Sequence, residues 1–257
     1  MNTDYTSVTE VTGYKVTKEQ IQRMYTRYRF ASEFCAGRDV LEVACGSGQG
    51  LGYLAKKAKS VIGGDCDDKL VKSAESNYEG RIKIFKLDAH KLPFDNGAFD
   101  VIILYEALYY LQNPEKFVNE AYRVLRKDGL VIIGTVNKDW SGYNPSPFSY
   151  KYYAAPEMNE LLKNGGFSKI EFYGDCPSES KTLKDRVVSL IKKIAVALHL
   201  IPKTMKGKEL FKRIFVGKLT ALPAEITDDL SEYIPPVEIP NGINTNFKVI
   251  FAVARRK

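Results

Sequence analysis

The sequence predicts an α/β domain in which helices cover both faces of a doubly wound, mostly parallel sheet. Short apolar runs alternate with helical patterns over residues 18–174, which is typical of parallel strands joined by helical crossovers. The run FDVIILYE at 99–106 is almost wholly apolar, like a central strand covered on both faces. A glycine-rich turn follows the first apolar run. Ligands of such sheets bind at the carboxyl ends of the strands.

The first half of the chain predicts a helix over 18–35, where Ile21, Met24, Tyr28 and Ala31 repeat at helical spacing. There follow a strand that starts at 39 and runs into glycines, a helix over 50–58, a strand over 60–65, a helix over 67–78, and strands over 81–89 and 99–106. Asp67 or Asp68 is the expected N-cap of the helix over 67–78.

The second half continues the alternation. It predicts a helix over 114–129 that is ended by Gly129, a strand over 130–136 and an aromatic loop over 137–154. There follow a helix over 155–167 with Gly165 and Gly166 at its end, a strand over 168–174 and a last strand over 246–257. We expect the aromatic loop to lie over the mouth of the site, because it follows a sheet strand at its carboxyl end.

Composition favours one globular domain over 1–257. The chain has 257 residues, 44% of them hydrophobic and 27% charged. The N-terminus lacks the basic start and apolar run of a secretory signal. Four cysteines without a Cys-x-x-Cys pair, and only two histidines, give no zinc-ligand spacing. We expect a cytoplasmic protein without a metal site.

The basic charge is local. Residues 181–218 hold 11 Lys and Arg against two acids, within an expected helical insertion over 175–245. Val187, Ile191, Ile194 and Leu198 form an apolar stripe there. Basic amphipathic helices of this kind bind anionic membrane surfaces, but they also serve as lids or dimer faces. Nucleic acid is not favoured, because aromatic residues do not alternate with the lysines.

The glycine-rich turn is the first candidate site. It reads Glu42-x-Ala44-x-Gly46-x-Gly48-x-Gly50, between a predicted strand and a predicted helix. Such turns let a ligand approach backbone N–H groups closely. The third glycine of a dinucleotide fingerprint would fall at 51, where Leu51 stands. An acid inside the turn suits a cationic ligand better than a pyrophosphate, so Glu42 argues against a nicotinamide cofactor.

Two further acids follow at later strand ends. Asp65, with Cys66 after it, ends the second strand and can accept hydrogen bonds from two ribose hydroxyls, unless it only caps a helix. Asp88 and Ala89 end the third strand, where an acid can accept from an adenine amino group, unless it only caps a loop. We interpret His90 as a loop residue, with a role beside the cofactor as the alternative.

These pieces in order resemble the class I S-adenosylmethionine-dependent methyltransferases, in particular their small-molecule branch of the ubiquinone-biosynthesis type. The matching segments are VLEVACGSGQG, VIGGD, LDAHKLPF, FDVIILYEALYYL and LRKDGLVII. The resemblance implies a Rossmann-like seven-stranded sheet whose last strand is antiparallel and inserted beside the sixth. It also implies that S-adenosyl-L-methionine is the cofactor, with Gly46 and Gly48 at its methionine portion, Asp65 at the ribose, Asp88 and Ala89 at the adenine, and Tyr105 and Glu106 beside the methyl donor.

The acceptor is less well defined by the sequence. Candidate bases are Glu106, Tyr109 and Tyr110 in YEALYYL, although helical spacing would also let the tyrosines pack and Glu106 cap. The aromatic loop suits a ring, a sugar or a lipid headgroup. We expect methylation of an oxygen or nitrogen on a small or lipid-linked acceptor such as a glycan sugar. The alternatives are a non-catalytic cofactor-binding member of the fold and a nucleotide-cofactor oxidoreductase.

Overall fold

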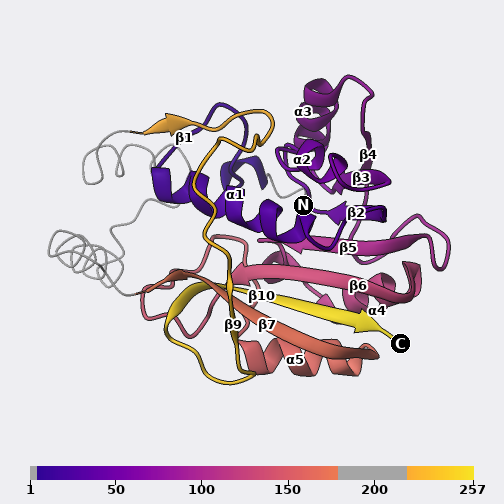
Figure 1. Ribbon diagram of the computed structural model, residues 1–257. Coiled ribbons are helices and arrows are strands. Elements are labelled where there is room, and N and C mark those ends of the chain that lie inside the picture. The colour runs from indigo at the N-terminus through magenta and orange to yellow at the C-terminus, as the bar shows by residue number, and fades with distance from the viewer. Residues whose placement is uncertain (1–4, 179–218) are drawn as a thin grey trace, which may run out of the picture.

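An eight-stranded mixed sheet forms the centre of the molecule (Figure 1). The computed structural model describes residues 5–178 and 219–257. The strand order is β4-β3-β2-β5-β6-β10-β7-β9. The strands are β2 (Asp39–Val43), β3 (Ser60–Asp65), β4 (Lys83–Lys86), β5 (Phe99–Tyr105), β6 (Leu125–Val136), β7 (Phe167–Pro177), β9 (Val237–Ile239) and β10 (Phe247–Arg256).

The sheet confirms the predicted topology. Strands β4, β3, β2, β5 and β6 pair in parallel, and strand order reverses between β2 and β5. The last strand, β10, is antiparallel to both β6 and β7 and lies between them, as expected. The prediction of seven strands is one short, because the three-residue β9 pairs with β7 at the edge.

Helices cover both faces, and each face has its own apolar core. On one face lie α1 (Lys18–Ser32), α2 (Leu51–Ala55) and α3 (Asp68–Tyr78). On the other lie α4 (Pro114–Val124) and α5 (Ala155–Asn164). Asp67 is the N-cap of α3 and accepts a hydrogen bond from the Lys69 N–H at 2.8 Å, which settles the choice between Asp67 and Asp68.

Two predicted features change in the structure. The helix predicted over 114–129 ends at Val124, because Leu125 already pairs with Phe99 as β6 begins. Of the expected helical insertion over 175–245, residues 175–177 belong to β7, and the described segment after 218 holds β8 (Thr220–Ala221) and β9. The amphipathic pattern at 181–218 falls outside the described residues. In the described part, no helix is both long enough and apolar enough to cross a bilayer.

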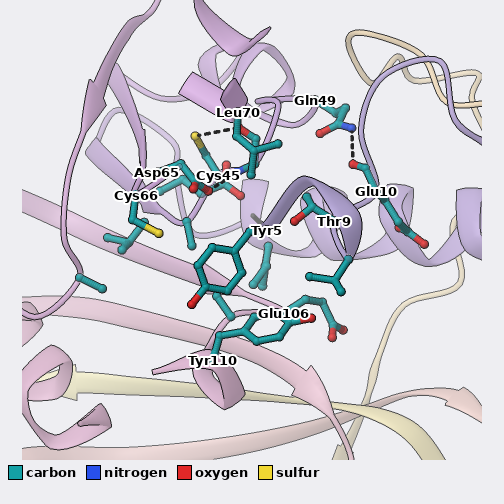
Figure 2. A pocket seen from close by; sticks show the side chains of 18 of the residues that line it. Tyr5, Thr9, Glu10, Cys45, Gln49, Asp65, Cys66, Leu70, Glu106 and Tyr110 are labelled. Carbon is teal, nitrogen blue, oxygen red and sulfur yellow. Dashed lines mark hydrogen bonds between the residues drawn. The ribbon is translucent and has the colours of Figure 1, made fainter. Parts of the chain in front are cut away.

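An N-terminal segment lies across the glycine turn. It begins with the 3-10 helix η1 (Tyr5–Ser7) and continues to β1 (Lys15–Val16), which pairs with β8. The Tyr5 N–H donates to Asp67 Oδ2 at 3.1 Å. The Gln49 amide donates to the Glu10 carbonyl at 2.9 Å (Figure 2). This segment therefore closes one side of the space above the sheet.

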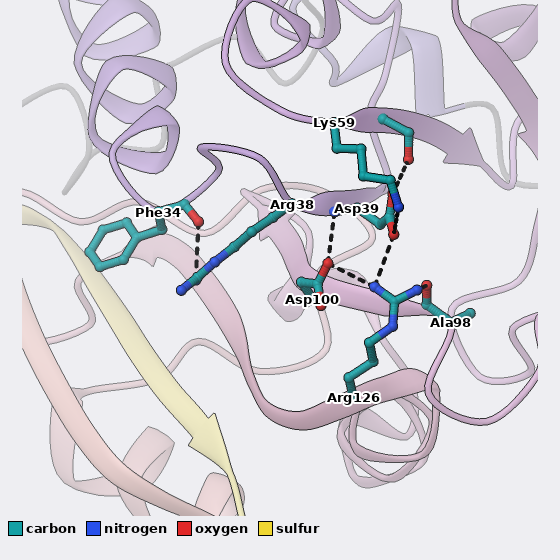
Figure 3. A network of polar contacts seen from close by, with 8 residues as sticks. Phe34, Arg38, Asp39, Lys59, Ala98, Asp100 and Arg126 are labelled. Atoms are coloured by element: carbon teal, nitrogen blue, oxygen red, sulfur yellow. Dashed lines mark hydrogen bonds and ion pairs between the residues drawn. The ribbon is translucent and has the colours of Figure 1, made fainter.

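The opposite end of the sheet is held by an ion-pair network (Figure 3). Arg126 Nη1 lies 2.9 Å from Asp39 Oδ2 and 2.7 Å from Asp100 Oδ2, and its Nη2 donates to the Ala98 carbonyl at 2.8 Å. Asp100 also accepts from the Asp39 N–H at 2.9 Å. These bonds join β2, β5 and β6 at the start of the first two strands, remote from their carboxyl ends.

Candidate active site

A cavity of about 370 Å³ lies at the carboxyl ends of the parallel strands (Figure 2). Its volume falls in the usual range for small-ligand sites. Residues from β2, β3 and β5, from α1 and from the N-terminal segment line it. In Figure 2, Asp65, Cys66 and Cys45 lie on one side, and Tyr5, Tyr110 and Glu106 on the other. The cavity thus joins the predicted cofactor residues to the predicted catalytic ones.

The glycine turn adopts left-handed backbone at alternate positions. Ala44, Gly46 and Gly48 have φ values of 57°, 59° and 80°. A Cβ at Gly50 would lie 1.9 Å from the Tyr28 ring, so α1 requires glycine there. Ala44 bears a steric strain that glycine at this position would avoid. Ala44 and Gly46 both line the cavity.

Glu42 is a buried acid with one unpartnered oxygen. Its side chain lines the cavity, and the residue is 1% exposed. The Tyr28 hydroxyl donates to Oε1 at 2.7 Å, whereas Oε2 has no hydrogen-bond partner among the described residues. Burial raises the pKa of Glu42 to about 8. A buried polar atom without a partner is costly, so this oxygen calls for a partner from a ligand, and a cationic donor would displace the proton that burial makes the acid retain.

Asp65 is fixed by two backbone N–H groups. Its Oδ1 accepts from Asp67 at 3.0 Å, and its Oδ2 from Gly46 at 3.0 Å. Burial raises the pKa of its carboxyl. Each oxygen keeps a lone pair for a further donor, and Asp65 lines the cavity with Cys66. The acid therefore joins the glycine turn to the end of β3.

Asp88 and Ala89 lie just beyond β4 and line the same cavity. The Asp88 side chain is 65% exposed, and its Oδ1 lies 2.6 Å from His90 Nδ1. Hydrogen bonds from His90 hold the pKa of Asp88 below its ordinary value, although partial burial opposes them. His90 thus orients Asp88 and lines the cavity itself, a position that favours a role beside the cofactor over that of a plain loop residue.

The candidate catalytic residues meet at the end of β5. Glu106 has φ of 52°, an unusual value for a glutamate, and such outliers cluster at functional sites. The Tyr109 hydroxyl donates to Glu106 Oε2 at 3.0 Å. Burial and the nearby Glu106 charge raise the pKa of Tyr109 well above its ordinary value, so Tyr109 keeps its proton. Tyr110 lies at the wall, with its hydroxyl 2.6 Å from Ser146 Oγ.

The remaining predicted residues pack behind this cluster. Tyr105 is buried, and its hydroxyl donates to the Arg27 carbonyl at 2.9 Å while the residue lines the cavity. The aromatic loop over 137–154 lies behind Tyr109, where Tyr152 stacks on that ring at 4.3 Å. The loop therefore supports the wall of the cavity, and Tyr152 does not itself line it.

Sequence reasoning missed two arginines and the N-terminal segment. Arg23 and Arg27 lie one helical turn apart on α1, and both line the cavity. Arg23 Nη2 lies 3.7 Å from Glu106 Oε1. Tyr5, Thr9 and Glu10 line the cavity from the N-terminal segment. The available signal was the i, i+4 spacing of two arginines beside a buried apolar stripe.

Comparisons with known proteins agree with this geometry. Residues 41–133 match the family described as "Methyltransferase domain". A relative from Mycolicibacterium smegmatis, named "Probable S-adenosylmethionine-dependent methyltransferase", is 34% identical over 153 residues, which are 57% of this chain and 58% of the relative. A "Phthiotriol/phenolphthiotriol dimycocerosates methyltransferase" from Mycobacterium leprae is 35% identical over 97 residues, 37% of this chain and 36% of that protein.

A solved structure shares the fold over nearly the whole chain. It is a "SAM-dependent methyltransferase, possible histamine N-methyltransferase" from Thermotoga maritima, with a TM-score of 0.59, 16% identity, and coverage of 93% of this chain and 92% of that one. The present chain spans little more than half the length of the first curated relatives it matches. Residues 41–133 therefore carry a methyltransferase domain, the chain is similar in sequence to S-adenosylmethionine-dependent methyltransferases, and its sheet has the fold of a solved one.

Proposed function

We propose that this protein binds S-adenosyl-L-methionine and transfers its methyl group to an oxygen or nitrogen of a small or lipid-linked acceptor. The unpartnered Oε2 of Glu42 carries the proposal, because a buried acid that lacks a donor fits the ammonium of an amino-acid ligand. The cavity connects that oxygen to Glu106. A single site can therefore hold both a cofactor and an acceptor.

The residues fit the cofactor from end to end. Glu42 would accept from its ammonium, with Ala44 and Gly46 at the methionine portion. Gly48 does not line the cavity and instead packs closely against Ala74 and Tyr78 of α3. Burial raises the pKa of Glu42, and the nearby charge of Arg27 opposes part of that rise, so Arg27 suits the adjoining carboxylate. Asp65 and Cys66 would flank the ribose. Asp88 and Ala89 would flank the adenine, with Tyr105 behind the methyl donor.

When bound, the cofactor supplies a methyl carbon activated by its sulfonium. The protein then has to place the nucleophile in line and exclude water. Glu106 would accept, at its carboxylate, the proton of an attacking hydroxyl, or the proton that an ammonium must lose before the neutral amine attacks. Tyr109 would keep its own proton and orient Glu106 through their 3.0 Å hydrogen bond. Tyr110 would form part of the acceptor wall.

A lipid-linked acceptor, such as a sugar of a surface glycan, is the narrower form of the proposal. The relative from Mycobacterium leprae is named for a lipid substrate, and aromatic side chains line the acceptor side of the cavity. The basic segment 181–218 would bring a cytoplasmic protein to an anionic membrane surface. Acceptor class and membrane contact are both proposals from these observations.

Transfer of a radiolabelled methyl group tests this function. The protein is incubated with methyl-labelled S-adenosylmethionine and a total cell extract, and label is counted separately in lipid and aqueous fractions. We expect transfer to one fraction, and Glu106→Gln to slow it by about 10²–10⁴-fold without changing cofactor affinity. Glu160→Gln, on an exposed residue of α5, is the matched control. Cofactor binding with no transfer to either fraction would favour a non-catalytic, ligand-binding role.

A further inference from the structure

Two guanidinium groups face the cavity with most of their donors unused. The Arg23 side chain is only 24% exposed, and its buried Nε has no hydrogen-bond partner in the part of the chain that the structure describes. Among the described residues its one ion pair is to Glu106 and spans 3.7 Å, which is longer than a hydrogen bond. Within residues 5–178 and 219–257, the Arg27 guanidinium has neither a hydrogen bond nor an ion pair.

This arrangement is costly without a ligand. Arginine stays protonated in proteins, so these groups cannot neutralise themselves when they are buried. A buried charge is stable only when it is paired and hydrogen-bonded. The planar fork of arginine matches a carboxylate or phosphate through two parallel hydrogen bonds. Against the effect of burial, the nearby Glu106 and Glu10 raise the pKa of both arginines, but they leave the guanidinium forks without hydrogen bonds among the described residues, so each fork can still bind an oxyanion.

The cofactor supplies only one such oxyanion. S-adenosylmethionine carries a single carboxylate. Arg27 is next in sequence to Tyr28, whose hydroxyl binds Glu42 Oε1 at 2.7 Å, so we assign Arg27 to the amino-acid end. Burial lowers the pKa of Arg27, but Glu106 also lies near enough to raise it. Arg23 lies one turn earlier on α1 and pairs with Glu106. In Figure 2, Glu106 lies on the same side of the cavity as Tyr5 and Tyr110. Those two rings pack edge to face with centroids 5.5 Å apart. The second oxyanion would thus belong to whatever lies against this aromatic wall.

We propose that the methyl acceptor is itself an anion: a molecule with an apolar or aromatic body and a carboxylate or phosphate that Arg23 binds. The body would lie against Tyr5 and Tyr110, and the nucleophile would face Glu106. Arg23 would then determine specificity, because a neutral analogue would leave its Nε unpaired. The inference rests on the proposed function, since it assigns Arg27 and the other half of the cavity to the cofactor.

Paired probes test the inference on the full chain. Binding of S-adenosylhomocysteine is measured first by calorimetry. The loaded protein is then titrated with benzoate, phenyl phosphate and benzamide, which share a ring and differ in charge. We expect benzoate or phenyl phosphate to bind at least about tenfold more tightly than benzamide, and the stronger of the two identifies the oxyanion.

Variants on one helix complete the design. Arg23→Gln should lower the affinity for the favoured anion to that for benzamide. Its affinity for S-adenosylhomocysteine should stay unchanged, which also shows that the variant folds. Arg23→Lys should retain part of the preference, because it keeps the charge and loses the fork. Arg29→Gln is the matched control, since Arg29 packs on Tyr233 and does not line the cavity. Equal binding of all three probes, no binding of any, or an unchanged preference in Arg23→Gln would each overturn the inference. If S-adenosylhomocysteine itself does not bind to the wild-type protein, the proposed function is refuted before the inference is tested.

Discussion

Replacing Glu42 by glutamine should stabilise the protein and at the same time weaken its cofactor binding. The pKa of this carboxyl rises from an ordinary 4.5 to about 8, because folding buries it. Between these two values the folded chain holds a proton that the unfolded chain releases, so stability falls as the pH rises from about 4.5 to about 8. Below that window both states are protonated, and the acid costs nothing.

The magnitude follows from the same two values. At pH 7 burial of Glu42 lowers the free energy of unfolding by about 3 kcal/mol, because each pH unit above the ordinary pKa costs about 1.4 kcal/mol. Glutamine resembles the protonated acid and can still accept from the Tyr28 hydroxyl. The amide NH2 of glutamine takes the place of Oε2, which has no hydrogen-bond partner among the described residues. A buried donor without an acceptor costs about 1 kcal/mol of stability. We therefore expect a net gain of about 2 kcal/mol at pH 7.

Urea denaturation of the ligand-free protein at pH 5, 7 and 8 measures this effect. The gain in Glu42→Gln should be smallest at pH 5 and largest at pH 8, whereas Glu160→Gln should change nothing at any pH. Calorimetry should show weaker binding of S-adenosylmethionine to the stabilised variant. A variant that is less stable than the wild type at pH 7 and pH 8, or an effect that does not depend on pH, would refute the reasoning about burial.

Three further substitutions test other parts of the account. Asp65→Ala should weaken cofactor binding by about 1–3 kcal/mol by calorimetry, and unchanged affinity would remove it from the site. Ala44→Gly should raise the unfolding free energy by about 0–1 kcal/mol, because relief of a left-handed alanine outweighs the added chain entropy; a clear loss in urea titrations would contradict this. Arg126→Ala should cost about 1 kcal/mol, since it breaks half-exposed bonds to Asp39 and Asp100, yet leave cofactor affinity unchanged; reduced affinity would show coupling along the sheet.

The predictable part of the structure follows from local signals. Apolar runs, glycines at left-handed positions and acids at strand ends are readable one segment at a time. For that reason the sequence alone is enough to place Glu42, Gly46 and Asp65 at one site. The sheet brings these strand ends to one cavity, because parallel strands end at one edge.

The missed features depend on tertiary contacts. An apolar stripe predicts the helix α1, and nothing in that stripe shows that Arg23 and Arg27 face a cavity. The helix predicted over 114–129 is too long because Gly129 resembles a helix end, whereas pairing of Leu125 with Phe99 starts β6 earlier. An edge strand as short as β9 leaves almost no sequence pattern, so it emerges only from its pairing with β7.

Calorimetric titration with S-adenosylmethionine, S-adenosylhomocysteine and NAD in parallel tests the central claim most directly. The buried acid of the glycine turn and the absence of a glycine at Leu51 predict binding of the first two ligands and none of NAD. Binding of NAD alone, or of none of the three, would contradict the account.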